Sequence, residues 1–119
     1  MDKFELLYRW IRLMQSGVSL EKLLLDREAR RVGVYGYDPI AECMVYELKE
    51  SSVQIVSLID QKGEKVLIDY PACKPSEIKN LDLDAIIVMA VGDFQVIKKE
   101  LHMYTSAPVI SVVELLYEL

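Results

Sequence analysis

Short, nearly continuous runs of apolar residues divide the chain from Arg31 onwards. The runs read RVGVYG, VQIVSLID, DAIIVMAV and PVISV, and they are rich in Val and Ile without strict alternation of apolar and polar positions. Such runs are typical of parallel strands whose two faces are both covered. We therefore predict four buried strands of a mainly parallel sheet.

The segments between these runs have the length and the charge pattern of helices. They read PIAECMVYELKE after the first run and FQVIKKELHMY after the third. Strands that alternate with helices form right-handed crossovers in an α/β sheet. For the remaining segment, from Gly63 to Leu81, we expect a short edge strand over Val66 to Asp69 and a turn or brief helix around Ser76 to Asn80. The pattern predicts a three-layer α/β/α domain over residues 31–119.

Residues 1–30 precede the first predicted strand and have the pattern of a helical N-terminal arm. Apolar residues recur at steps of three and four between Asp2 and Met14, which places them on one stripe of a helix. They are Phe4, Leu7, Trp10, Ile11 and Met14. Ser19 is a suitable N-cap for a second short helix. We favour packing of the stripe against the rest of the domain over its use as a docking surface.

The first predicted strand ends in a turn that almost matches a dinucleotide-binding fingerprint. In that fingerprint, glycines and the following helix N-terminus hold a pyrophosphate. Gly36 occupies the first glycine position, but Asp38 occupies the second and Ala41 the third. A carboxylate at the second position adds bulk and negative charge where an anionic ligand would lie. Asp38 followed by Pro39 also fits an N-cap and a first helical residue, and we favour this structural role.

A second acidic residue lies near the spacing that dinucleotide folds use for the ribose. Asp60 follows the second predicted strand, 24 positions after Gly36, and the fingerprint places an acidic residue about 20 positions on. A turn-forming Asp ahead of Gly63 explains the same residue equally well. Both interpretations remain open from the sequence.

The third predicted strand ends in AVGDF, which contains Gly92 and Asp93. We expect this strand to lie beside the first, where strand order reverses and ligands of open α/β sheets bind. Gly92 and Asp93 should then face the turn that contains Gly36, Tyr37 and Asp38, with Asp93 as a helix cap. The candidate ligand-binding residues are therefore these five together with Asp60.

Charge and composition narrow the classes of partner. The net charge of −5 disfavours nucleic acid and acidic membrane surfaces. The longest apolar run has seven residues, Ala85 to Val91, whereas a membrane helix needs about 20.

The charged N-terminus does not resemble a signal peptide, so we expect a cytoplasmic protein with no membrane partner and with Cys43 and Cys73 reduced. His102 has no neighbouring Cys or His, and we predict no metal site.

The chain resembles the Rossmann-like domains of bacterial nucleoside-diphosphate-sugar epimerases, dehydratases and other proteins of surface-polysaccharide biosynthesis. The resemblance rests on RRVGVYGYDPIAECMVYELKE, VQIVSLIDQKG, LDLDAIIVMAVGDFQVIKKEL and APVISVVELL. It implies an NAD(P)-binding-type fold, and Asp38 departs from the glycine that this family commonly keeps. It does not identify a cofactor.

From these features we expect a non-catalytic or accessory Rossmann-like module with a degenerate glycine-rich loop. It would self-associate as a homodimer through its N-terminal helices, or work beside a sugar-modifying enzyme. The alternative is a nucleotide or nucleotide-sugar binder of an epimerase-like enzyme, which would use Gly36, Tyr37, Asp60 and Gly92. A regulatory domain that senses a small metabolite in the same crevice is a third interpretation.

Overall fold

The computed structural model describes residues 1–117, and positions 118 and 119 lie outside this description. Within residues 1–117, five strands form one sheet in the order β3-β2-β1-β4-β5, and every pair of neighbours is parallel. The strands are β1 (Arg31–Tyr35), β2 (Gln54–Ile59), β3 (Ala72–Cys73), β4 (Ala85–Val88) and β5 (Val109–Ser111). The order places β4 beside β1, as the sequence predicted, and gives a Rossmann-like α/β topology.

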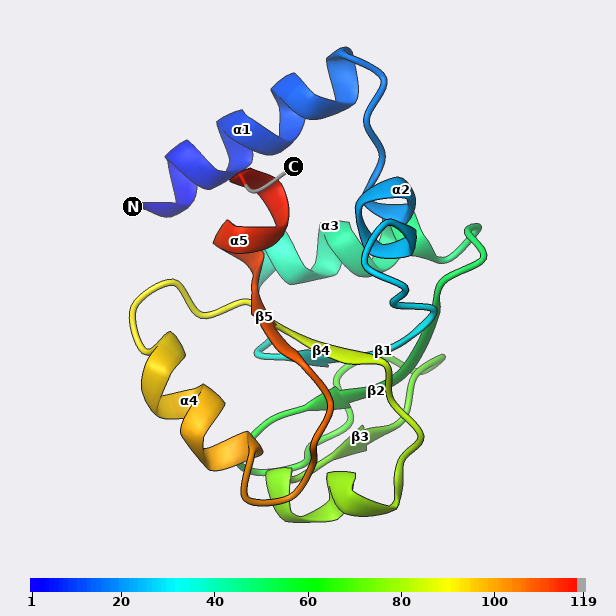
Figure 1. The fold of residues 1–119 in the computed structure, drawn as a ribbon, viewed down its shortest axis with the longest axis vertical. Helices are drawn as coiled ribbons and strands as arrows, with labels where there is room; N and C mark the ends of the chain where they lie inside the picture. The colour runs from blue at the N-terminus through cyan, green and yellow to red at the C-terminus, as the bar shows by residue number, and fades with distance from the viewer. Residues whose placement is uncertain (118–119) are drawn as a thin grey trace.

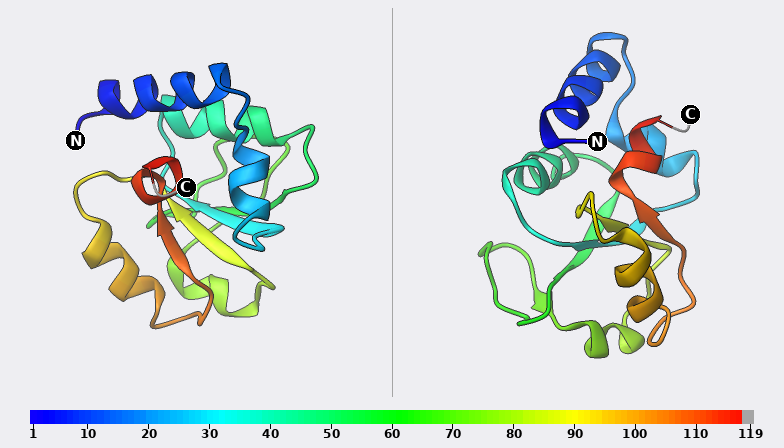
Figure 2. Two further views of the ribbon diagram at one scale, coloured as in Figure 1. Left: turned by 45° about the horizontal axis from the view of Figure 1, so that its top comes forward. Right: turned by 90° about the vertical axis from the view of Figure 1, so that its left-hand side faces the viewer.

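Helices cover both faces of this sheet and make three layers (Figure 1). On one face lie α1 (Lys3–Gln15), α2 (Leu20–Leu25), α3 (Pro39–Leu48) and α5 (Val112–Tyr117). On the other face lie the short 3₁₀ helix η1 (Pro75–Asn80) and α4 (Phe94–Leu101). The two further views show α1 as the outermost element, above α3 and α5 (Figure 2). None of the helices in the described part of the chain is long and apolar enough to cross a membrane.

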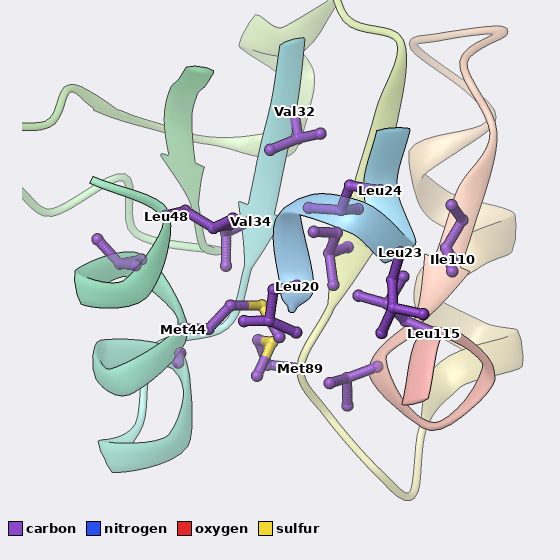
Figure 3. Close-up of a cluster of buried hydrophobic side chains, with 14 of the residues drawn as sticks. Leu20, Leu23, Leu24, Val32, Val34, Met44, Leu48, Met89, Ile110 and Leu115 are labelled. Carbon is purple, nitrogen blue, oxygen red and sulfur yellow. The ribbon is translucent and has the colours of Figure 1, made fainter. Parts of the chain in front are cut away.

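The larger hydrophobic core fills the space between the sheet and the helices of the first face (Figure 3). Leu20 and Leu24 of α2 meet Val34 of β1 and Met44 of α3 in this core, and each of these side chains is at most 1% exposed. Burial of one such side chain contributes about 1.5–3 kcal/mol. The helices that precede β1 are thus part of the same core as the sheet.

The structure corrects the predicted orientation of α1. The helix exists as expected, and Asp2 caps it by accepting from the Glu5 amide at 2.8 Å. Its buried face, however, consists of Leu6, Trp10 and Leu13. Of the predicted stripe only Trp10 is buried, because α1 is apolar around more than half of its circumference and the periodicity alone does not choose between two overlapping faces.

The predicted edge strand over Val66 to Asp69 was also wrong. The edge strand is β3, and it pairs Ala72 and Cys73 with the end of β2. In the preceding loop the Tyr70 amide donates to the Leu67 carbonyl at 3.3 Å, which makes a turn. Leu67 and Tyr70 thereby pack together against the core, an arrangement that an extended strand cannot provide for residues three apart. The predicted brief helix around Ser76 to Asn80 is confirmed as η1.

The buried face of α1 yields a test of how strongly this helix is held. Trp10 is 5% exposed, so Trp10→Ala removes a large core side chain. We expect a loss of about 3–5 kcal/mol in the free energy of unfolding. Phe4 lies on the same helix but is 77% exposed, so Phe4→Ala is the matched control and should change stability by less than about 0.5 kcal/mol. Denaturant unfolding followed by circular dichroism measures both; equal effects would contradict the assigned face.

Candidate functional site

The turn after β1 lies between the ends of its two neighbouring strands. Gly36 has a φ of +90°, which favours glycine. Its amide donates to the Ile59 carbonyl at the end of β2, at 3.1 Å. A Cβ built on Gly36 would lie 3.7 Å from the Met89 Cβ and 4.0 Å from the Ala90 amide nitrogen, just beyond β4. Gly36 is therefore at the strand-end crevice that the sequence predicted.

Asp38 is the N-cap of α3, as expected, and both of its carboxylate oxygens are engaged. Oδ1 accepts from the Ala41 amide at 2.8 Å, and Oδ2 lies 2.9 Å from the Lys3 ammonium group of α1. Pro39 follows as the first helical residue. The Asp38 side chain thus occupies the position at which the N-terminus of α3 would receive an anion.

Tyr37 points its hydroxyl to the first turn of α3. The hydroxyl donates to Glu42 Oε2 at 2.7 Å. This hydrogen bond to a carboxylate stabilises the neutral phenol, and together with partial desolvation and the Glu42 charge it raises the pKa of Tyr37 to about 12. Tyr37 is therefore a neutral hydrogen-bond donor near neutral pH, already paired within the protein.

Asp60 makes the turn that follows β2. Its carboxylate accepts from the Gly63 amide, and Gly63 has a φ of +68°. The next residue, Gln61, donates from Nε2 to the Tyr35 hydroxyl at 2.9 Å and to Glu100 Oε1 of α4 at 2.6 Å. The end of β2 is thus tied to β1 and to α4 by side chains, beside the place where a ribose would lie in a dinucleotide fold.

Gly92 and Asp93 lie in the loop between β4 and α4. A Cβ built on Gly92 would meet no atom within 4 Å, so nothing in the fold requires glycine there. Asp93 occupies the N-cap position of α4, but its side chain makes no capping hydrogen bond, which corrects the expected role. Its φ of −105° and ψ of 27° depart from the extended backbone that the capping residues Ser19 and Asp38 adopt.

The structure therefore brings the six candidate residues to one edge of the sheet, but their side chains do not point to a shared ligand site. The side chains of Asp38, Tyr37 and Asp60 form hydrogen bonds with residues that follow them closely in the sequence, and Asp38 also pairs with Lys3 of α1. Within residues 1–117 there is no group of three or more His, Cys, Asp or Glu residues that could hold a metal ion. The first turn of α3 carries two carboxylates, that of Asp38, which pairs with the Lys3 ammonium group, and that of Glu42, and their negative charge disfavours a diphosphate there.

Sequence reasoning missed three side-chain contacts at this edge of the sheet. Lys3 reaches Asp38 from 35 positions away and Glu100 reaches Gln61 from 39 positions away, so no local pattern could indicate either contact. Glu42 follows Tyr37 by five positions. The one sequence signal for this contact was that Glu42 is an acidic residue in the first turn of a predicted helix, a position that the helix dipole favours.

A model of one protein family, described as C2185-like, N-terminal, matches residues 28–107. The chain belongs to the C2185-like N-terminal family. No curated protein and no solved structure matches the chain.

The segment shared with the C2185-like N-terminal family contains β1 to β4 and all six candidate residues. Helices α1, α2 and α5 and strand β5 lie outside the matched segment. The ion pair between Lys3 and Asp38 therefore joins a residue outside the family match to one inside it.

The bond between Tyr37 and Glu42 can be tested by titration. The pKa of Tyr37 is raised to about 12, above the ordinary value of about 10. The full stabilisation of the folded state by this hydrogen bond is therefore present below a pH of about 10. It is lost as the pH rises through the pKa of Tyr37 in the folded state. In an ultraviolet absorbance titration, the difference between the native protein and Tyr37→Phe should show this late phenolic transition.

Glu42→Gln supplies the control for this titration. The amide removes the charge and the strong acceptor, so we expect the Tyr37 transition to move down towards the ordinary value. A Tyr37 transition that stays at the same pH in Glu42→Gln would show that Glu42 is not its cause.

Proposed function

We propose that this chain is a non-catalytic, accessory Rossmann-like module whose dinucleotide loop is closed by its own side chains. It would act beside a partner in nucleotide-sugar or surface-polysaccharide metabolism, the setting suggested by the sequence resemblance. The proposal concerns a binding or scaffolding role, because fold alone carries no activity.

The observation that carries the proposal is the double engagement of Asp38. A pyrophosphate at this position needs free amides and no negative charge. Here the Ala41 amide is bonded to Asp38 Oδ1, and Asp38 Oδ2 lies 2.9 Å from the Lys3 ammonium group. A dinucleotide would have to displace the cap and then lie against the carboxylate that it displaced.

Two further features support the setting of the proposal. The family is described as an N-terminal one, which fits a module that works with another part of a protein. Cys43 and Cys73 are both free, which fits the reducing environment of the cytoplasm. The rival function, a nucleotide or nucleotide-sugar binder, would use the same edge of the sheet.

A thermal-shift screen against NAD, NADP, UDP-sugars and coenzyme A tests the proposal directly. A ligand at 100 times its dissociation constant adds about 2.7 kcal/mol of stability, which a melting curve detects. We expect no shift for the native protein with any of these compounds. A concentration-dependent shift with one of them would favour the rival function.

Two variants identify the cause of a negative result. Asp38→Gly removes the carboxylate, and glycine is itself a tolerated N-cap that costs a few tenths of a kcal/mol. Lys3→Ala removes only the ion pair and leaves the cap in place. We expect nucleotides to stabilise Asp38→Gly but not Lys3→Ala. Stabilisation of Lys3→Ala without stabilisation of Asp38→Gly would show that the Asp38 carboxylate is not what excludes the ligand.

A further inference from the structure

Helix α4 is attached to the sheet by few buried side chains. The crossover helix of the first face, α3, buries Ile40, Ala41, Met44, Val45 and Leu48. In α4 the buried residue is Leu101, at the end of the helix, and Phe94 and Ile97 are partly buried against the same core. A helix of eight residues is not stable alone in water. The helical state of α4 therefore depends on these three side chains and on any polar contact that adds to them.

The N-terminal end of α4 is weakly fixed. Within residues 1–117, the Asp93 side chain caps no amide of α4, whereas Asp38 caps α3. A Cβ built on Gly92 would meet no atom within 4 Å, so the loop ahead of α4 lies in open space there. This loop extends away from the sheet before the helix begins (Figure 1). The N-terminal end of α4 can therefore move without breaking a side-chain cap.

The C-terminal end of α4 is held by one side chain from the strand ends. Gln61 Nε2 donates to Glu100 Oε1 at 2.6 Å, and a hydrogen bond to an ionised carboxylate is stronger than one between neutral groups. Glu100 precedes Leu101, so this hydrogen bond and the buried side chain hold the same end of the helix.

The position of Gln61 is itself fixed by the sheet. Its Nε2 also donates to the hydroxyl of Tyr35, the last residue of β1, at 2.9 Å. Tyr35 is 9% exposed, whereas Gln61 is exposed in the turn that follows β2. The side chain that ties α4 to the sheet is therefore accessible to solvent although its anchor is buried.

We propose that α4 is a flap that leaves the sheet as one unit while the rest of the domain stays folded, and that the Gln61 side chain is its latch. Parts of a protein that bury few apolar side chains open at a lower free energy than the core. Opening would uncover Val88 of β4 and Val109 of β5, which belong to the same core as Leu101. Because the latch is exposed, a molecule that binds the Gln61 amide would release α4. The inference does not depend on the proposed function, since it holds with or without a ligand at the N-terminus of α3.

Native-state hydrogen exchange followed by NMR tests the flap. We expect the amides of residues 98–101 in α4 to share one opening equilibrium and to exchange about 100-fold or more faster than the amides of residues 43–48 in α3. They should exchange together, because a helix this short loses its hydrogen bonds once it leaves the sheet. Exchange of α4 at the rate of α3, through global unfolding, would overturn the proposal. So would rates that change gradually from one end of α4 to the other, which indicate fraying.

Gln61→Ala tests the latch, because it removes this hydrogen bond and leaves Leu101 in place. We expect about tenfold faster exchange of the amides of residues 98–101 and unchanged exchange of residues 43–48. Gln54→Ala is the matched control: Gln54 lies at the other end of β2, where its Oε1 accepts from Arg31 at 2.9 Å. This control should leave the exchange of α4 unchanged.

Three results would show that Gln61 is not a latch. One is unchanged exchange of α4 in Gln61→Ala, and another is an equal effect of Gln54→Ala on α4. The third is a rise in the exchange of α3 that equals the rise in α4, because Gln61→Ala would then destabilise the whole domain and not the flap.

Discussion

A parallel sheet of this kind must be covered on both faces, and the rest of the structure follows from how this short chain meets that requirement. The loop between β2 and β3 contains no helix, so a single crossover helix, α3, lies on the first face. The remaining area is covered by α5 and by α2, whose Leu20 and Leu24 are buried against the strands. α1 then packs outside this layer through Leu6, Trp10 and Leu13. The N-terminal helices are thus a structural replacement for a helix that the β2–β3 connection lacks.

This arrangement determines what happens at the strand ends. Because α1 crosses above the first face, its first residue, Lys3, is brought to Asp38 at the start of α3. An exposed ion pair of this kind contributes little to stability. The ion pair matters for position, because it holds Oδ2 of Asp38 in place while Oδ1 of the same carboxylate already caps α3. The N-terminus of α3 is a place where this topology could bind an anion, and here the Asp38 side chain occupies it.

The sequence predicted those features whose cause is local. Four buried strands, the Asp38 cap and the brief helix at η1 follow from runs of apolar residues and from capping chemistry, and the structure confirms them. The face of α1 could not be predicted because apolar residues surround most of the helix, and the choice depends on which side α3 and α5 occupy. The contacts of Lys3 with Asp38 and of Gln61 with Glu100 join distant segments, so only the folded chain reveals them. Candidate residues were therefore located correctly at the sheet edge, while their bonding partners were not.

The packing of α1 and the ion pair at the start of α3 are coupled through one helical turn. Lys3 belongs to the first turn of α1, which Asp2 caps and which precedes the buried residues Leu6, Trp10 and Leu13. Because those buried side chains fix the position of α1, the entropic cost of holding Lys3 near Asp38 is already met by the folding of the core. A change that loosens α1 from the core would therefore also release the second carboxylate oxygen of Asp38, although the two sites are far apart in the sequence.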